Sequence, residues 1–221
     1  MHNMKYKGII FDLDGTLADT LDDIAGSMNS VLSAHHYPAH PVNDYKLLVG
    51  RGLENLVLNS LPVKARLPAL VSKCLAEMIE HYNYNCLVST HLYDGIREML
   101  DVMIKHRLKL AVFSNKAEPL TRKIVTHLLG DVPFVSIMGA RPDLPRKPDP
   151  AGAFFISRQM EVSPQQIVYM GDSDVDMITA TKAGMFAVGV LWGFRSGEEL
   201  RASGANVLLD HPSGLIPSLE N

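Results

Sequence analysis

Two aspartates, Asp12 and Asp14, follow the short apolar run Ile9-Ile10-Phe11 near the start of the chain. An apolar run of this length that Asp and Gly bring to an end is typical of a buried strand in a parallel sheet. Alternate side chains of an extended segment share a face, so both carboxylates are expected together at the carboxyl end of that strand. Two carboxylates held close together repel each other unless a cation binds between them or one of them is protonated. The pair therefore suggests a hard metal ion beside a reactive oxygen.

The segment Asp12–Gly15 also has a simpler interpretation as a turn, because Asp and Gly are common where a strand ends. A calcium-binding EF-hand loop begins with the same spacing of aspartates, but it requires Gly at its sixth position and Glu at its twelfth. Counted from Asp12, those positions hold Leu17 and Asp23. This excludes the EF-hand loop and leaves the turn and the metal-dependent site.

Further polar clusters follow apolar runs later in the chain: Ser114 with Asn115, Lys147 in a Pro-rich loop, and Asp172 with Asp176. Taken singly, each has an ordinary structural role, since Ser and Asn cap helices and a loop lysine is usually solvated. In open parallel sheets, ligands bind outside the carboxyl ends of the strands. Strands that share one direction would bring all these clusters to the same edge, and the joint pattern therefore predicts a site there.

The elements that must position these residues follow from hydrophobic periodicity. Residues 18–36, 44–61 and 63–84 have apolar side chains at helical spacing, with a break at Gly50–Gly52. After Asp94-Gly95, strands and helices alternate, which predicts an α/β fold with a Rossmann-like, doubly wound parallel sheet and an all-helical insertion after the first strand. The expected strands cover residues 9–11, 108–113, 134–138, 167–170, 187–191 and 207–209. The expected helices cover 96–106 and 119–129, with two more that end near residues 160 and 183.

The composition is that of an ordinary globular protein, with 221 residues, 47% hydrophobic residues, 20% charged residues and a net charge of −3. The sequence has no basic tract of the kind that binds nucleic acids, and its longest apolar runs are too short to span a bilayer. The N-terminal residues contain no apolar leader segment, and Cys74 and Cys86 lack the spacing of a metal site. We therefore expect a cytoplasmic protein that binds neither nucleic acid nor membranes.

The combined motifs resemble the haloacid dehalogenase superfamily of hydrolases that carry a helical cap. The resemblance covers nearly the whole chain, and it implies an α/β catalytic core made of residues 1–16 and 94–221 with a helical cap domain at 17–93. The four matching motifs, in chain order, are Asp12-Leu13-Asp14-Gly15-Thr16, Ser114-Asn115, Lys147, and Gly171-Asp172-Ser173 with Asp176.

This resemblance implies phosphoryl transfer to Asp12, which attacks phosphorus and forms an aspartyl-phosphate. Asp14 would protonate the leaving alkoxide and later deprotonate the attacking water, and related dehalogenases lack this second aspartate. Lys147, the third catalytic residue, would neutralise charge on Asp12 and on the phosphoryl group. Ser114 and Asn115 would bind phosphoryl oxygens as substrate-binding residues.

The same resemblance implies a Mg²⁺ cofactor. Its ligands would come from Asp12, the main-chain carbonyl of Asp14 and Asp172. Asp176 completes the predicted metal site, where it would orient the water shell of the metal or Lys147.

Within the superfamily the chain is most similar to phosphoglycolate phosphatases, through Lys116, Arg146–Pro150 and Val49–Leu53. The expected substrate is a small phosphorylated metabolite, and the expected state is a monomer or homodimer. Arg51 lies between two glycines at a break in the cap helices and is predicted to bind the distal group of the substrate, unless it is a solvated residue of a turn. The remaining alternatives are a phosphomutase similar to β-phosphoglucomutase, a pyrophosphatase, and a non-catalytic phosphate-binding scaffold.

Overall fold

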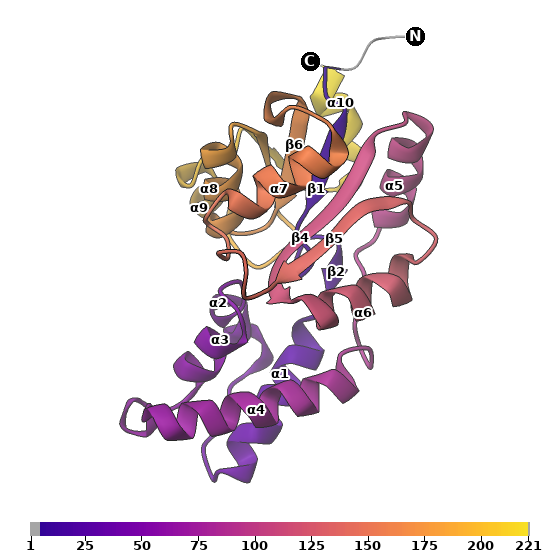
Figure 1. Ribbon diagram of the computed structural model, residues 1–221. Helices are drawn as coiled ribbons and strands as arrows, with labels where there is room; N and C mark the ends of the chain where they lie inside the picture. The colour runs from indigo at the N-terminus through magenta and orange to yellow at the C-terminus, as the bar shows by residue number, and fades with distance from the viewer. Residues whose placement is uncertain (1–4, 221) are drawn as a thin grey trace.

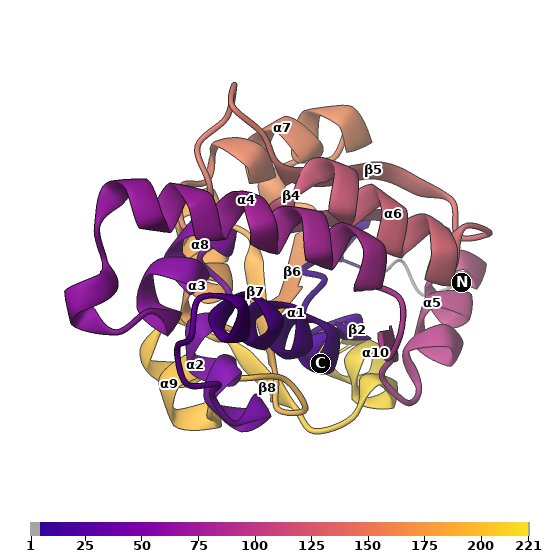
Figure 2. The same ribbon diagram turned by 90° about the horizontal axis from the view of Figure 1, so that it is seen from below.

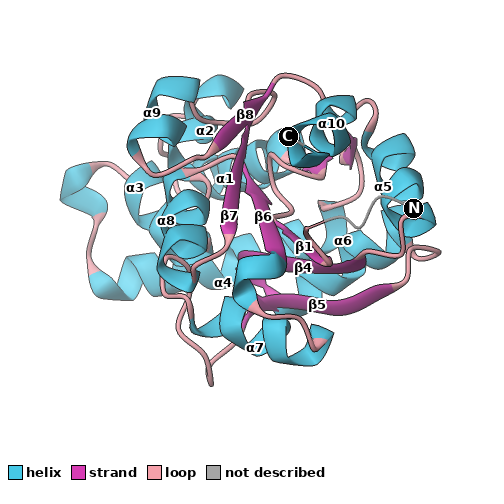
Figure 3. Ribbon diagram, turned by 90° about the horizontal axis from the view of Figure 1, so that it is seen from above, coloured by secondary structure: helices cyan, strands magenta, loops and turns pink. Residues whose placement is uncertain are grey.

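A six-stranded sheet forms the centre of the computed structural model, which describes residues 5–220. The strands lie in the order β5-β4-β1-β6-β7-β8, and every neighbouring pair is parallel. Helices cover both faces, with α5, α6 and α10 on one side and α7, α8 and α9 on the other (Figure 3). The predicted doubly wound α/β fold is confirmed. The strands are β1 (Gly8–Phe11), β4 (Lys109–Ala117), β5 (Phe134–Ala140), β6 (Ile167–Gly171), β7 (Phe186–Val190) and β8 (Val207–Leu209). The helices are α5 (Ile96–Lys105), α6 (Glu118–Leu129), α7 (Ala151–Met160), α8 (Asp174–Ala183), α9 (Gly197–Ala202) and α10 (Leu215–Glu220).

Successive residues of the central strand β1 pack on opposite faces of the sheet. Ile9 and Phe11 contact the core that includes α5 and α6, whereas Ile10 contacts the core that includes α7 and α8. A strand that is buried on both faces must be apolar throughout, which explains why its sequence shows no alternation. Because β1 lies between β4 and β6, its carboxyl end lies in the middle of one edge of the sheet.

A helical segment follows β1 and lies beyond the carboxyl edge of the sheet, as Figures 1 and 2 show. The chain enters and leaves it through a two-stranded antiparallel ribbon, in which Ala18 pairs with Leu92 and Asp19 with His91. The elements of this part are β2 (Ala18–Asp19), α1 (Leu21–Ala34), α2 (Tyr45–Leu48), α3 (Leu53–Ser60), α4 (Pro68–Asn85) and β3 (His91–Leu92). Single 3-10 turns lie at Val42–Asp44, Val63–Ala65, Pro164–Gln166 and Pro212–Gly214.

Strand β4 is longer than its apolar run predicts. The expected strand ended before Ser114, but β4 continues to Ala117, which pairs with Ala140 of β5. The pairing changes register between Phe113 and Ala117, so more residues of β4 than of β5 lie in this stretch. Polar residues can therefore remain in a strand at its irregular end. The residue that precedes α6 is Ala117, so the alternative in which Ser114 and Asn115 cap that helix is wrong.

No helix within residues 5–220 is long and apolar enough to cross a membrane. Cys74 and Cys86 are both buried, and neither forms a disulfide. Both cysteines belong to the core that α1 and α4 share with one face of the sheet.

Candidate active site

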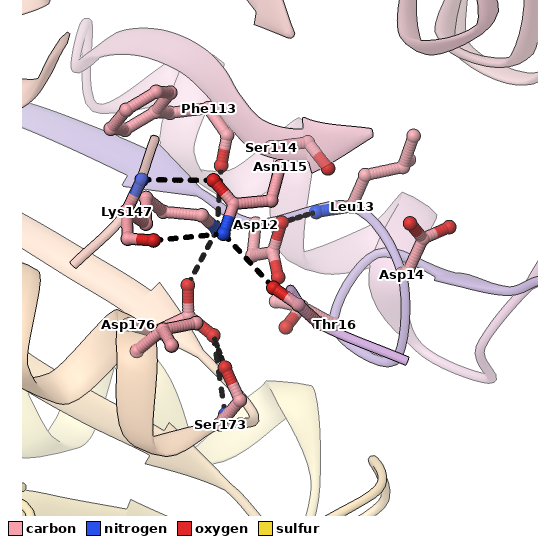
Figure 4. A network of polar contacts seen from close by, with 12 residues as sticks. Asp12, Leu13, Asp14, Thr16, Phe113, Ser114, Asn115, Lys147, Ser173 and Asp176 are labelled. Carbon is pink, nitrogen blue, oxygen red and sulfur yellow. Dashed lines mark hydrogen bonds and ion pairs between the residues drawn. The ribbon is translucent and has the colours of Figure 1, made fainter. Parts of the chain in front are cut away.

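Asp12 is the first residue after β1, and its carboxylate is ion-paired with Lys147. The Lys147 Nζ atom lies 3.0 Å from Asp12 Oδ1 and 2.6 Å from Asp176 Oδ1. It also donates a hydrogen bond to the main-chain oxygen of Phe113 at 3.0 Å. Figure 4 shows the three charged side chains gathered at one place, and all three are buried. The loop after β5 therefore brings Lys147 to the end of β1, as the sequence pattern predicts.

Asp172 follows β6 and completes a group of three carboxylates. One oxygen from each of Asp12, Asp172 and Asp176 lies within 4.8 Å of the others. The Thr16 hydroxyl donates to Asp172 Oδ1 at 3.3 Å, and the main-chain N–H of Phe194 donates to Asp172 Oδ2 at 2.8 Å. Hard divalent cations prefer oxygen donors of this kind. The predicted metal ligands Asp12 and Asp172 thus share one small volume.

Gly15 packs directly against this group. Its φ angle is +80°, a left-handed conformation that side chains other than glycine rarely adopt. A Cβ atom at this position would lie 2.2 Å from Asp172 Oδ2. Glycine is therefore required for Asp172 to keep its position.

The carboxylates carry more negative charge than Lys147 alone can balance. Burial and the Asp176 carboxylate raise the pKa of Asp12 to about 7, although Lys147 acts in the opposite direction. Burial, followed by the charges of Asp176 and Asp12, raises the pKa of Asp172 well above its usual value. Burial disfavours the charge of Lys147, but Asp12 and Asp176 outweigh it and raise its pKa well above the usual value. A divalent cation would offset the excess negative charge, so the residues present fit the metal that the motifs imply.

Asp14 takes part in a second buried network. Lys116 Nζ lies 2.7 Å from Asp14 Oδ1, and the Thr20 hydroxyl donates to the same oxygen at 2.6 Å. Lys116 also donates to the hydroxyl of Tyr82 on α4 at 2.6 Å. Burial acts against the charge of Lys116, but Asp14 and Tyr82 raise its pKa above the usual value. Asp14 lies apart from the Lys147 group in Figure 4, so the two aspartates have different partners.

Asn115 connects the sheet edge with the helical segment. Its side chain accepts a hydrogen bond from the Lys147 N–H at 2.9 Å and donates to the Lys147 main-chain oxygen at 3.0 Å. It also donates to the main-chain oxygen of Gly50 at 2.9 Å. Ser114 is buried beside it, and its hydroxyl accepts a hydrogen bond from the Lys116 N–H at 3.2 Å. Both predicted substrate-binding residues of β4 therefore lie next to the charged network.

A small cavity, here called the reaction pocket, lies between this edge and the helical segment. Its volume is about 30 Å³. The polar part of its wall comes from the sheet edge, and the apolar part comes from α1, α3 and the loop before α3. The lining residues are Asp12, Asp14, Ile24, Val49, Gly50, Gly52, Leu53, Leu56, Ser114, Asn115 and Lys116.

Arg51 lies outside the reaction pocket, although its neighbours Gly50 and Gly52 line it. The Arg51 guanidinium contacts Asp174 of α8 at 2.5 Å, and its side chain is 54% exposed. The structure thus brings six predicted residues to one edge, namely Asp12, Asp14, Ser114, Asn115, Lys147 and Asp172, with Asp176 behind them. It does not bring Arg51 into the pocket.

Three residues of the second network had no predicted role. Lys116 directly follows the second motif, so its position beside the site could have been inferred from that neighbourhood. Thr20 and Tyr82 stand in helical sequence, where nothing marks them as polar partners of Asp14. Only the packing of α4 against the sheet edge brings Tyr82 to Lys116.

The comparisons with known proteins agree with this architecture. The family described as haloacid dehalogenase-like hydrolase matches residues 9–190. A phosphoglycolate phosphatase of Pseudomonas putida is 29% identical over 95% of this chain and 78% of its own length. An N-acetylmuramic acid 6-phosphate phosphatase of Pseudomonas aeruginosa is 29% identical over 100% of this chain and 97% of its own length.

A solved structure supports the same assignment. The crystal structure of a predicted phosphoglycolate phosphatase from Haemophilus somnus superposes with a TM-score of 0.90 at 26% identity, over 98% of this chain and 99% of that chain. The resemblance that the four motifs indicated is therefore confirmed. The chain belongs to the haloacid dehalogenase-like hydrolases.

Proposed function

We propose that the chain is a Mg²⁺-dependent phosphatase that hydrolyses a small phosphorylated metabolite through an aspartyl-phosphate, with phosphoglycolate as the leading substrate. The observation that carries the proposal is the buried Asp12–Lys147 ion pair, with the second carboxyl group of Asp14 in the same pocket. A nucleophile and a separate acid–base group are what hydrolysis of a phosphate ester in two steps requires.

In the first step, an oxygen of the Asp12 carboxylate attacks phosphorus, and the bond from phosphorus to the leaving oxygen breaks. Asp14 gives its proton to that oxygen, so the oxygen leaves as an alcohol hydroxyl and not as an alkoxide. Lys147 lies against Asp12 and balances the negative charge that collects on the phosphoryl oxygens. Ser114 and Asn115 are near enough in the pocket wall to orient those oxygens.

In the second step, Asp14 takes a proton from a water molecule, which attacks the phosphorus of the aspartyl-phosphate. The bond between phosphorus and the Asp12 oxygen breaks, so free phosphate leaves and Asp12 is restored. Thr20 and Lys116 hold the Asp14 carboxylate in place for this proton transfer.

Asp12, Asp172 and the main-chain carbonyl of Asp14 would hold the Mg²⁺ ion. When bound, the ion supplies positive charge that offsets repulsion between the carboxylates and an anionic substrate. Asp176 has other partners, because it accepts hydrogen bonds from Lys147 and from the Ser173 hydroxyl at 2.5 Å. We assign Asp176 to positioning Lys147.

We further propose that residues 17–93 act as a cap on a catalytic core made of 1–16 and 94–221. The antiparallel ribbon at Ala18–Asp19 and His91–Leu92 and the contact between Asn115 and Gly50 support this division. With the cap packed on the core, the pocket holds little beyond a phosphoryl-sized group, which favours exclusion of water during the first step.

A screen for phosphate release tests the proposed function. The panel should contain phosphoglycolate and N-acetylmuramic acid 6-phosphate, since relatives with both names match this chain, together with β-glucose 1-phosphate and pyrophosphate. We expect phosphate release from a monoester with Mg²⁺ and none with a chelator. Isomerised sugar phosphate without free phosphate would instead indicate a phosphomutase, and preferred cleavage of pyrophosphate would indicate a pyrophosphatase. Binding of phosphate esters without any turnover would indicate that the protein is a non-catalytic scaffold.

A further inference from the structure

A second cavity adjoins the reaction pocket and shares Leu53 and Asn115 with it. Its volume is about 480 Å³, far larger than that of the reaction pocket. One wall comes from α3 and α4, and the other comes from β4, the end of β5 and the loop that precedes Lys147. The lining residues are Leu53, Glu54, Leu75, Ile79, Asn115, Ala117, Ala140, Arg141, Pro142, Leu144, Pro145 and Arg146.

Most cations near the two cavities are already paired. Lys147 and Lys116 are engaged by buried carboxylates, and Arg51 is engaged by Asp174. Arg141 lies 3.0 Å from Asp143 and packs over the ring of Phe155. Each of these groups already has an anionic partner, so none of them offers an unpaired cation to a second anionic group of the substrate, beyond the phosphoryl group.

Arg146 differs from these cations. Its side chain is exposed, and its guanidinium forms no hydrogen bond or ion pair with any residue of the described range 5–220. Glu54 lines the same cavity without pairing with it. A guanidinium in this state is free to bind a carboxylate through two parallel hydrogen bonds.

The backbone of the cap positions Arg146 at the boundary between the cavities. A Cβ atom on Gly52 would lie 2.6 Å from Arg146 Nη1, so glycine leaves room for the guanidinium against the wall of the reaction pocket. Gly52 also has a φ angle of +87°, which a residue with a side chain would adopt only under strain. Arg146 immediately precedes Lys147, so one short loop carries both the free guanidinium and the lysine that is paired with Asp12.

We propose that Arg146 binds a carboxylate on the leaving group of the substrate, and that this group extends from the reaction pocket into the adjoining cavity. The inference rests on the proposed phosphatase function and narrows its substrates to phosphate monoesters of hydroxy acids. The apolar side chains of Leu53, Leu75 and Ile79 give the carbon chain a surface to pack against. The role that the sequence analysis gave to Arg51 is thereby assigned to Arg146.

The test compares pairs of substrates that differ only in the carboxylate. Phosphoglycolate is paired with 2-hydroxyethyl phosphate, and 6-phosphogluconate with sorbitol 6-phosphate. For the wild type with Mg²⁺, we expect kcat/KM to be higher for the carboxylated member of at least one pair. Arg146→Gln should lower kcat/KM for that substrate roughly 10- to 100-fold. For the substrate without a carboxylate, kcat/KM should change about twofold or less. Arg146→Lys should recover part of the loss, because it keeps the charge but not the forked geometry.

The ratio within a pair distinguishes recognition of the carboxylate from a general effect on the site. A displaced Lys147 or a weaker electrostatic field at the phosphate would lower kcat/KM for both substrates of a pair by the same factor. That result would overturn the inference. Equal activity of the wild type on both members of each pair would also overturn it, as would a ratio that responds to Arg51→Gln instead of Arg146→Gln. Arg158→Gln is the matched control, because Arg158 is an exposed residue in the last turn of α7. This substitution should leave kcat/KM unchanged for both substrates of each pair. If no monoester is hydrolysed at all, the proposed function itself fails.

Discussion

Replacement of Asp12 by Asn should abolish turnover and at the same time stabilise the metal-free protein at alkaline pH. In the folded protein, burial and Asp176 raise the pKa of Asp12 from 3.8 to about 7. Between these values the folded chain binds more protons at this site than the unfolded chain, so the free energy of unfolding falls as the pH rises. Asn resembles the protonated carboxyl group in shape and carries no charge, and the variant therefore avoids this loss.

The pKa change also sets the size of the effect. A rise of roughly three units at about 1.4 kcal/mol per unit gives an upper limit of about 4 kcal/mol at pH 8. The amide packs less well against Lys147 than a carboxyl group does, so we expect Asp12→Asn to be more stable by about 1–4 kcal/mol at pH 8. At pH 5.5 the unfolded carboxyl group is already ionised and the folded one is still protonated, so the upper limit is about 2 kcal/mol, and the difference should fall below about 1 kcal/mol only near pH 4.

Urea unfolding in the presence of EDTA measures this difference. Trp192, the single tryptophan of the chain, donates a hydrogen bond to the Thr16 main-chain oxygen at 3.0 Å, so its fluorescence reports on the site. Asp131→Asn is the control, because Asp131 is an exposed residue whose pKa is lowered by its hydrogen bond to Arg97, and the variant should gain no stability. At 100 times its dissociation constant, Mg²⁺ should stabilise the wild type by about 3 kcal/mol. It should stabilise Asp12→Asn by less. A variant no more stable than the wild type at pH 8 without metal would refute the reasoning.

Three other substitutions test the remaining parts of the site. Lys147→Met leaves two buried carboxylates without their cation, so it should destabilise the protein by about 3–5 kcal/mol in urea unfolding and abolish turnover. Gly15→Ala forces a Cβ atom against Asp172 at a positive φ angle, and we expect calorimetry to show at least about tenfold weaker Mg²⁺ binding than in the wild type. Tyr82→Phe removes one acceptor of the buried Lys116 ammonium and should cost about 1–3 kcal/mol in thermal unfolding; unchanged stability would show that Lys116 finds another partner.

The local pattern of the chain was sufficient to predict the sheet and its polar edge. The central strands β1 and β6 are short apolar runs that are buried on both faces, and Asp12 and Asp172 are the first polar residues after them. The parallel direction of the strands then brings those residues to one edge, whatever the intervening sequence contains. Such features depend on spacing within a few residues, which a single sequence displays.

The contacts between the helical segment and the sheet edge could not be predicted in this way. Arg51 was expected in the pocket because it is flanked by glycines, but the direction of its side chain depends on how the break between α2 and α3 packs against α8. The partnership of Tyr82 with Lys116 likewise joins a helix to a strand far away in the sequence. The end of β4 was misplaced because pairing with β5 through an irregular register can hold polar residues in a strand.

The ribbon formed by β2 and β3 has a consequence for how proteins of this architecture diversify. Because the chain departs and returns side by side at Ala18 and Leu92, everything between them is topologically a single loop on the core. The entropy of closing a loop grows only with the logarithm of its length, so even a doubling would cost about 0.6 kcal/mol. An insertion here can be lengthened, trimmed or exchanged with little penalty to the strands below it, and new specificities can arise without rebuilding the chemistry.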